Sequence, residues 1–274
     1  QAYLGDTVPY RQRGVALALS ETSWAGAMLL GAPLAGFLIA RQGWAAPFVW
    51  LGFLSLPMAW LIWKQMPAGD GGVARIPLSA LPRVFRRHRV IWFAALYMLL
   101  IMAANELFFI VYGGWMEEQF GLGLASLGLA TAVLGGAEIA GELAAGVAVD
   151  RFGKRPVIIT TGALTGLAYL LVPYTSRSLA LALITLFFVF LVFEITVVGG
   201  VPLMTEVVPS ARTVVLSIVL AAGSLGRMLG ALAGPFLWQR SGMGGNMLVA
   251  GLVMWLAVVL LAGRVRENAA GRGA

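Results

Sequence analysis

The sequence predicts an all-α polytopic membrane protein with eight transmembrane helices. Of its 274 residues, 60% are hydrophobic and only 11% are charged, a composition typical of membrane-embedded chains. Eight apolar runs reach the length of about 20 residues that a helix needs to cross a bilayer. The runs are too uniformly apolar for the alternating strands of an outer-membrane barrel. The predicted spans lie roughly at residues 14–40, 44–63, 90–113, 123–149, 157–173, 179–204, 213–238 and 247–262.

These spans divide the chain into four predicted parts. Residues 1–63 hold a cytoplasmic loop and two spans, which we expect to be the end of an N-terminal six-helix bundle. Residues 64–89 are rich in glycine, proline and basic residues, so we expect a cytoplasmic linker with a short amphipathic helix on the inner leaflet. A regulatory or partner-binding role is the alternative for this linker. Residues 90–263 hold six spans, a complete C-terminal bundle, and residues 264–274 form a cytoplasmic tail.

An internal repeat indicates that the chain arose by duplication. The acidic turn at residues 6–9, which ends in proline, returns about 200 residues later at 206–209, and Gly31 matches Gly230 in the helices that follow. Secondary transporters are built from such repeats. If the second copy begins near Val90, about 110 residues, or four helices, are expected before Gln1. The eight spans are then helices five to twelve of an N-terminally truncated, twelve-helix parent.

The basic residues predict the orientation of the chain in the membrane. Most of the 19 Lys and Arg fall on one side when the chain crosses eight times, which places both termini of this fragment in the cytoplasm of a cell inner (plasma) membrane. The net charge of +7 then reflects topology and anionic lipid, so no nucleic acid partner is implied. With no cysteine and His88 alone in a basic loop, we expect no metal, no cofactor and no catalytic residue, hence no enzyme.

Ionisable side chains inside the spans predict a polar cavity. The sixth, ninth and twelfth helices carry no charge, which suggests that they face lipid while the other helices enclose the cavity. Each charged residue is a candidate for proton coupling or for lining the cavity, and the alternative for each carboxylate is a structural pair with the single arginine. These candidates are Glu21, Glu106, Glu138, Glu142, Glu194 and Arg227.

The stretch 135–156 organises the second half of the chain. Its helix carries three carboxylates, Glu138, Glu142 and Asp150, along one broad stripe. A second stripe of small residues recurs every four positions from Gly136 to Ala148, a spacing that lets a neighbouring membrane helix approach closely. The helix ends in a compact charged turn at residues 150–156.

The turn at residues 146–155, with the sequence GVAVDRFGKR, resembles the signature loop of the major facilitator superfamily. The residues that match its pattern are Gly146, Asp150, Arg151, Gly153, Lys154 and Arg155. The resemblance implies two six-helix bundles that rock around a central cavity, lined by the first and fourth helices of each half, which points to Asn105, Glu106 and Glu194. It also implies that Asp150 caps the helix that starts near residues 8–14, as a conformational switch. The alternative is a charged turn that only sets topology.

The predicted function is secondary active transport of a small molecule by alternating access, with proton-coupled efflux as the favoured direction. Residues 26–36 partly resemble the Gly-Pro-rich fifth-helix motif of proton-coupled drug exporters, from which Ala32 and Phe37 depart. The alternatives are a sugar or metabolite uptake permease of the same fold and a non-transporting receptor or scaffold. The expected partners are a small-molecule substrate, protons, the lipid bilayer and the four missing helices.

Aromatic side chains on the seventh and tenth helices are candidates for stacking against an amphipathic substrate. The alternative is that they pack in the protein interior or lie at the lipid interface. The residues concerned are Tyr97, Phe108, Phe109, Tyr112, Trp115, Phe187, Phe188, Phe190 and Phe193.

Overall fold

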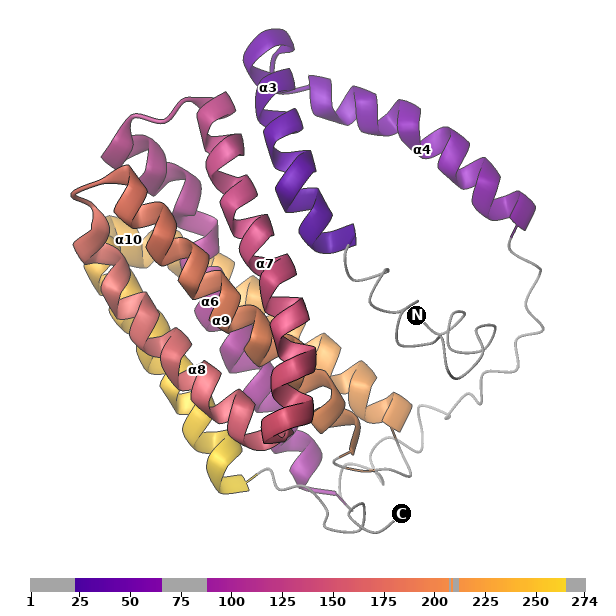
Figure 1. The fold of residues 1–274 in the computed structure, drawn as a ribbon, viewed down its shortest axis with the longest axis vertical. Coiled ribbons are helices and arrows are strands. Elements are labelled where there is room, and N and C mark those ends of the chain that lie inside the picture. Colours follow the sequence, from indigo (N-terminus) through magenta and orange to yellow (C-terminus); the bar gives the residue numbers. More distant parts are fainter. Residues whose placement is uncertain (1–22, 66–87, 207, 209–211, 265–274) are drawn as a thin grey trace.

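The computed structural model describes residues 23–65, 88–206, 208 and 212–264, and this part of the chain is helical without any strand (Figure 1). Seven of its helices are long and apolar enough to cross a membrane. The first of these spans, Ser23–Gln42, contains a π-helical turn followed by an α-helix, and the fifth, Lys154–Thr175, ends in a short 3-10 turn. The elements are η2 (Ala27–Gly31), α3 (Ala32–Gln42), α4 (Ala46–Gln65), α6 (Val90–Phe120), α7 (Leu124–Phe152), α8 (Lys154–Leu171), η4 (Val172–Thr175), α9 (Leu179–Glu206) and α10 (Arg212–Arg264).

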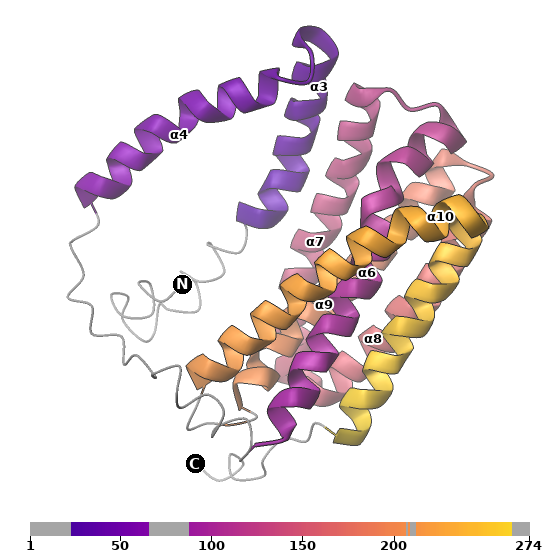
Figure 2. The ribbon, with the colours of Figure 1, turned by 180° about the vertical axis from the view of Figure 1, so that it is seen from behind.

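The last element, α10, is two helices that meet at Gly242. Its 53 residues would extend about 80 Å as a straight helix, far more than the roughly 30 Å of a bilayer core. Gly242 has φ 64° and ψ −171°, a non-helical conformation that glycine adopts readily, and the chain folds back there (Figure 2). The predicted break between residues 238 and 247 contains this kink. The count of eight spans, and their match to helices five to twelve of a longer protein, stay predictions.

Glycines with positive φ also end three other helices. Gly43 ends α3, Gly121 ends α6 and Gly153 ends α7, with φ of 88°, 65° and 84°. Each backbone N–H bonds back to a carbonyl in the last turn of its helix, as at common helix C-termini. The charged turn predicted after residue 149 is therefore a glycine stop, with α8 beginning at Lys154.

Helix α6 packs mainly against α10, and its candidate membrane span is the most buried of those in the described part of the chain. Gly226, Gly230 and Gly234 form a stripe on α10 that faces the α6 backbone. A methyl group at Gly226 would collide with the carbonyl oxygen of Leu99, and at Gly230 it would lie 2.7 Å from that of Ala103. Small residues at this spacing allow such close approach in membrane helix pairs.

Helix α3 packs on α7 in the same way, whereas α4 extends away from the other helices (Figure 1). Methyl groups at Gly128 and Gly135 would meet backbone atoms of the segment from Ala25 to Pro33. The predicted small-residue stripe is confirmed only in part, since Ala144 and Ala148 pack against a cluster that contains Ile195 of α9, whereas nothing lies within 4 Å of a methyl group at Gly136. Helix α4 exposes nearly all its large apolar side chains, as expected for a surface covered by lipid or by further helices.

Candidate functional site

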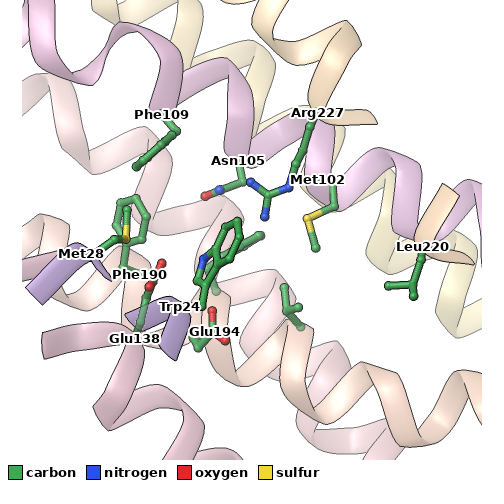
Figure 3. A pocket seen from close by; sticks show the side chains of 12 residues that line it. Trp24, Met28, Met102, Asn105, Phe109, Glu138, Phe190, Glu194, Leu220 and Arg227 are labelled. Carbon is green, nitrogen blue, oxygen red and sulfur yellow. The ribbon is translucent and has the colours of Figure 1, made fainter. Parts of the chain in front are cut away.

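A cavity of about 320 Å³ lies among the long helices, which is within the size range of small-molecule sites (Figure 3). Its lining comes from the segment that contains η2 and from α6, α7, α9 and the first half of α10. Within the described ranges, α4, α8 and the part of α10 after Gly242 contribute no lining residue. The lining residues are Trp24, Met28, Met102, Asn105, Phe109, Glu138, Phe190, Phe193, Glu194, Val197, Leu220 and Arg227.

An arginine from α10 is held between a carboxylate and an aromatic ring at this cavity. Nη1 of Arg227 lies 3.4 Å from Oε2 of Glu106 on α6, and its guanidinium lies over the ring of Trp24 at 5.7 Å from the centroid. The arginine side chain is 40% exposed and that of Glu106 is 13% exposed. The glycine stripe brings the backbone of α10 close to that of α6, and this close packing places Arg227 within reach of Glu106.

Asn105 lines the cavity and is fixed from behind by α8. The hydroxyl of Tyr169 donates a hydrogen bond of 3.1 Å to Oδ1 of Asn105, and both residues are buried. With its carbonyl oxygen engaged, the amide N–H₂ group of Asn105 is left as the donor that a bound molecule can use.

Two carboxylates enter the cavity from neighbouring helices. Glu138 on α7 is 6% exposed, and its Oε2 has no hydrogen-bond partner within the described part of the chain. Glu194 comes from α9. A methyl group at Gly141, less than one turn from Glu138, would lie 2.7 Å from Cβ of Glu194, so α7 and α9 approach closely where both carboxylates arise.

Aromatic rings form much of the apolar wall. The rings of Phe109 on α6 and Phe190 on α9 lie 6.1 Å apart with an interplanar angle of 61°, an edge-to-face arrangement, and Phe193 lies one turn from Phe190. Trp24 closes the wall from the segment before η2 (Figure 3).

Comparison with known proteins identifies the family of this chain. The family model described as Major Facilitator Superfamily matches residues 1–112 and 98–273. The chain belongs to the major facilitator superfamily. It is 24% identical over 231 residues to the uncharacterized MFS-type transporter YceJ of Bacillus subtilis (strain 168), covering 82% of this chain and 58% of that protein. The fold also matches that of a D-xylose-proton symporter, with a TM-score of 0.71 and 18% identity, over 97% of this chain and 66% of that one.

The two alignments cover most of this chain, but only 58% of the YceJ sequence and 66% of the symporter chain. Several apolar helices and membership of the superfamily make it a multi-pass membrane protein of a transporter family.

The structure brings some predicted site residues to the cavity and leaves others away from it. Asn105, Glu138, Glu194 and Arg227 line it, whereas Glu106 reaches it only through its pair with the arginine. Glu142 is half-buried one turn beyond Glu138 and is not among the lining residues. Glu21 lies outside the described residues.

The superfamily loop lies at the end of α7, away from the cavity. Asp150 and Arg151 are exposed there, and a guanidinium N–H of Arg155 donates to the carbonyl of Ala262 near the end of α10. The helix start that Asp150 was expected to cap, residues 8–14, lies outside the described residues, so the switch stays a prediction.

The aromatic candidates divide into cavity and interior residues. Phe109, Phe190 and Phe193 line the cavity, and Phe187 and Phe188 are exposed. The remaining four are buried in the core, namely Tyr97, Phe108, Tyr112 and Trp115.

Sequence reasoning missed the tyrosine that holds Asn105 and five of the lining residues, namely Trp24, Met28, Met102, Val197 and Leu220. Trp24 and Met28 stand three and seven positions after Glu21, a spacing that places residues on one helix face. Met102 stands three positions before Asn105, and Phe109 stands four positions after it. Tyr169 gave no comparable signal, because its partner lies on another helix.

Proposed function

We propose that this chain is the part from helix five to helix twelve of a secondary active transporter, which moves a small molecule by alternating access with proton coupling. The observation that carries the proposal is the cavity itself. In a chain whose spans are apolar, Asn105, Glu138, Glu194 and Arg227 come from four helices and share one space. Polar groups inside a membrane domain are unfavourable unless they serve a water-accessible path or a binding site.

The helix contacts suit a protein in which two bodies move against each other. In the proposal, η2 and α3 belong to the first bundle and α6 to α10 form the second. Much of the contact between them is made by η2 and α3 against α7, where Gly36, Gly128 and Gly135 let the backbones approach closely. A π-helical turn at Ala27–Gly31 stands just before Pro33, and such turns and prolines are common sites of helix bending.

Proton coupling requires a carboxylate that holds a proton in one state of the cavity and releases it in the other. Glu138 and Glu194 line the cavity, and Glu106 reaches it through Arg227, so these three are the leading candidates. Glu142 and Glu21 remain secondary ones.

Efflux is the direction we propose, because residues 26–36 partly resemble the fifth-helix motif of proton-coupled exporters. Met28 lies within this segment and Trp24 lies just before it, and both residues line the cavity. Uptake with protons is the alternative, and the solved relative named as a D-xylose-proton symporter supports the fold alone.

Flux measurements on the full-length protein in proteoliposomes test this function. A pH gradient is imposed across the vesicle membrane. One solute at a time is then added, either a neutral sugar, an aromatic monocation or an aromatic monoanion, and the pH inside the vesicles is followed. Protons moving opposite to the solute support exchange and therefore efflux, and protons moving with it support uptake. No saturable flux with any solute would favour a receptor or scaffold. Unchanged proton-driven flux in Glu106→Gln, Glu138→Gln and Glu194→Gln alike would remove these residues as proton carriers.

A further inference from the structure

Carboxylates outnumber basic groups among the side chains at the cavity. Three carboxylates, those of Glu106, Glu138 and Glu194, lie at or beside it, against the single guanidinium of Arg227. No other Lys or Arg is among the lining residues that the structure describes. Arg227 forms its ion pair with Glu106, at 3.4 Å, and the carboxylate of Glu138 lies on a different helix, α7.

The guanidinium group of Arg227 shows how this cavity accommodates a positive charge. The guanidinium of Arg227 lies beside the carboxylate of Glu106 and over the face of Trp24, at 5.7 Å from the ring centroid. A carboxylate together with an aromatic face is the arrangement that stabilises a poorly hydrated cation. The α7 side offers the same two elements, because the carboxylate of Glu138 and the ring of Phe190 both line the cavity and are drawn next to Met28 in Figure 3.

Glu138 lacks the partner that Glu106 has. It is 6% exposed, its Oε2 has no hydrogen-bond partner within the described residues, and Figure 3 shows the carboxyl group directed from α7 toward the space beside Met28. An ionised carboxylate buried in this way is unstable unless a positive charge lies beside it. The group can therefore be stabilised by binding a proton or by receiving a cation from the cavity.

We propose that the cavity binds an aromatic organic cation, whose positive charge lies beside Glu138 and whose rings pack against Phe190 and Phe109. This proposal rests on the transport function proposed above and names its substrate class. The cation and a proton occupy the Glu138 carboxyl group in turn, so the arriving cation releases the proton to the water of the cavity. The groups that bear on this exchange are Glu142 on the same helix, Glu194 on α9, Arg227 on α10 and its partner Glu106 on α6. Trp24 and Met28, which face the cavity from the segment of η2, carry no charge.

Equilibrium binding to the purified full-length protein tests the proposal. The probe is N-methyl-4-phenylpyridinium, a permanent aromatic cation, and the comparison probes are 4-phenylpyridine at alkaline pH, where it is neutral, and biphenyl-4-carboxylate. We expect the cation to bind at alkaline pH, to be displaced as the pH falls, and to bind more tightly than either comparison probe. Glu138→Gln is expected to weaken its binding by about 10-fold to 100-fold, the loss of one charge-assisted contact, and to remove most of the pH dependence.

Two variants keep the test informative. Glu138→Asp keeps the charge and is expected to retain pH-dependent binding with lower affinity. Glu118→Gln removes an exposed carboxylate near the end of α6, away from the cavity, and is expected to bind like the wild type. Equal affinity for the cation in wild type and Glu138→Gln, with the variant still monodisperse, would overturn the proposal, as would tighter binding of the anion. If a neutral sugar is transported with protons while the cation neither binds nor moves, the substrate class is wrong and the transport function stands. If no solute moves at all, the transport function itself fails.

Discussion

Replacing Gly230 by alanine tests the close helix contact beside the cavity. A methyl group at Gly230 would lie 2.7 Å from the carbonyl oxygen of Ala103 and 2.7 Å from Cβ of Glu106. Ordinary Cβ contacts begin at 3.4 Å, so α6 and α10 would have to separate by about 0.7 Å. The obstructing atoms are a backbone oxygen and a Cβ, neither of which can move away by a change of rotamer.

The stability change expected from this collision is moderate. Overpacking a tight contact destabilises by about 1–3 kcal/mol, and alanine gains roughly 0.5–1 kcal/mol over glycine within a helix. We therefore expect Gly230→Ala to lower the free energy of unfolding by about 1–2 kcal/mol. The measurement is reversible denaturation of the full-length protein in mixed micelles.

Gly263→Ala is the matched control for this variant. Gly263 lies in the same element, α10, and nothing lies within 4 Å of an added methyl group there, so its stability is expected to stay the same or rise. Equal free energies of unfolding for the two variants would refute the inference that α6 and α10 meet through their backbones. A second readout is substrate affinity, which should fall only in Gly230→Ala, because separating the helices pulls Glu106 from Arg227.

Three further experiments on the full-length protein use substitutions at single residues. Tyr169→Phe leaves Oδ1 of buried Asn105 without its donor, so we expect unfolding free energy to fall by about 1–3 kcal/mol and substrate affinity to fall with it; an unchanged Kd would remove Asn105 from the binding site. Glu106→Gln, Arg227→Gln and the double variant form a cycle with an expected coupling of about 1 kcal/mol, modest because the arginine is 40% exposed; zero coupling would show that the 3.4 Å pair contributes nothing to stability. Asp150→Asn is expected to reduce flux at unchanged unfolding free energy, since Asp150 is exposed; a parallel loss of stability would assign it a folding role instead.

Helix positions followed from hydropathy, but helix contacts did not. The predicted spans overlap the observed helices, and the break before residue 247 contains the kink at Gly242. The predicted packing stripe holds at Ala144 and Ala148 but not at Gly136, and the closest backbone approaches of α7 are made at Gly128, Gly135 and Gly141. A glycine-rich helix carries small residues on several faces, so spacing alone does not say which face meets a neighbour.

The candidate site was predictable where it carries charge. Glu138, Glu194 and Arg227 were found because ionisable residues are rare in membrane spans, and the structure places all three at one cavity. Of the apolar wall, Phe109, Phe190 and Phe193 were predicted candidates, and the remaining residues were not found, since an apolar side chain in an apolar helix has no distinguishing composition. The helical spacing around each charged residue was the usable signal, as Phe190 and Val197 on either side of Glu194 illustrate.

Small residues and charged residues act together to make the cavity. Glu106 meets Arg227 at a level where Gly230 lies against Cβ of Glu106, and Glu138 approaches Glu194 where Gly141 lies against Cβ of Glu194. With ordinary side chains at these two glycines, the helix axes would move apart and the polar groups would no longer share one space. The positions of Gly141 and Gly230 therefore affect the distances between the charged groups of the site as well as the packing of the helices. It follows that substitutions at Gly141 and Gly230 should alter substrate affinity and proton coupling even though neither glycine has a side chain to contact a ligand.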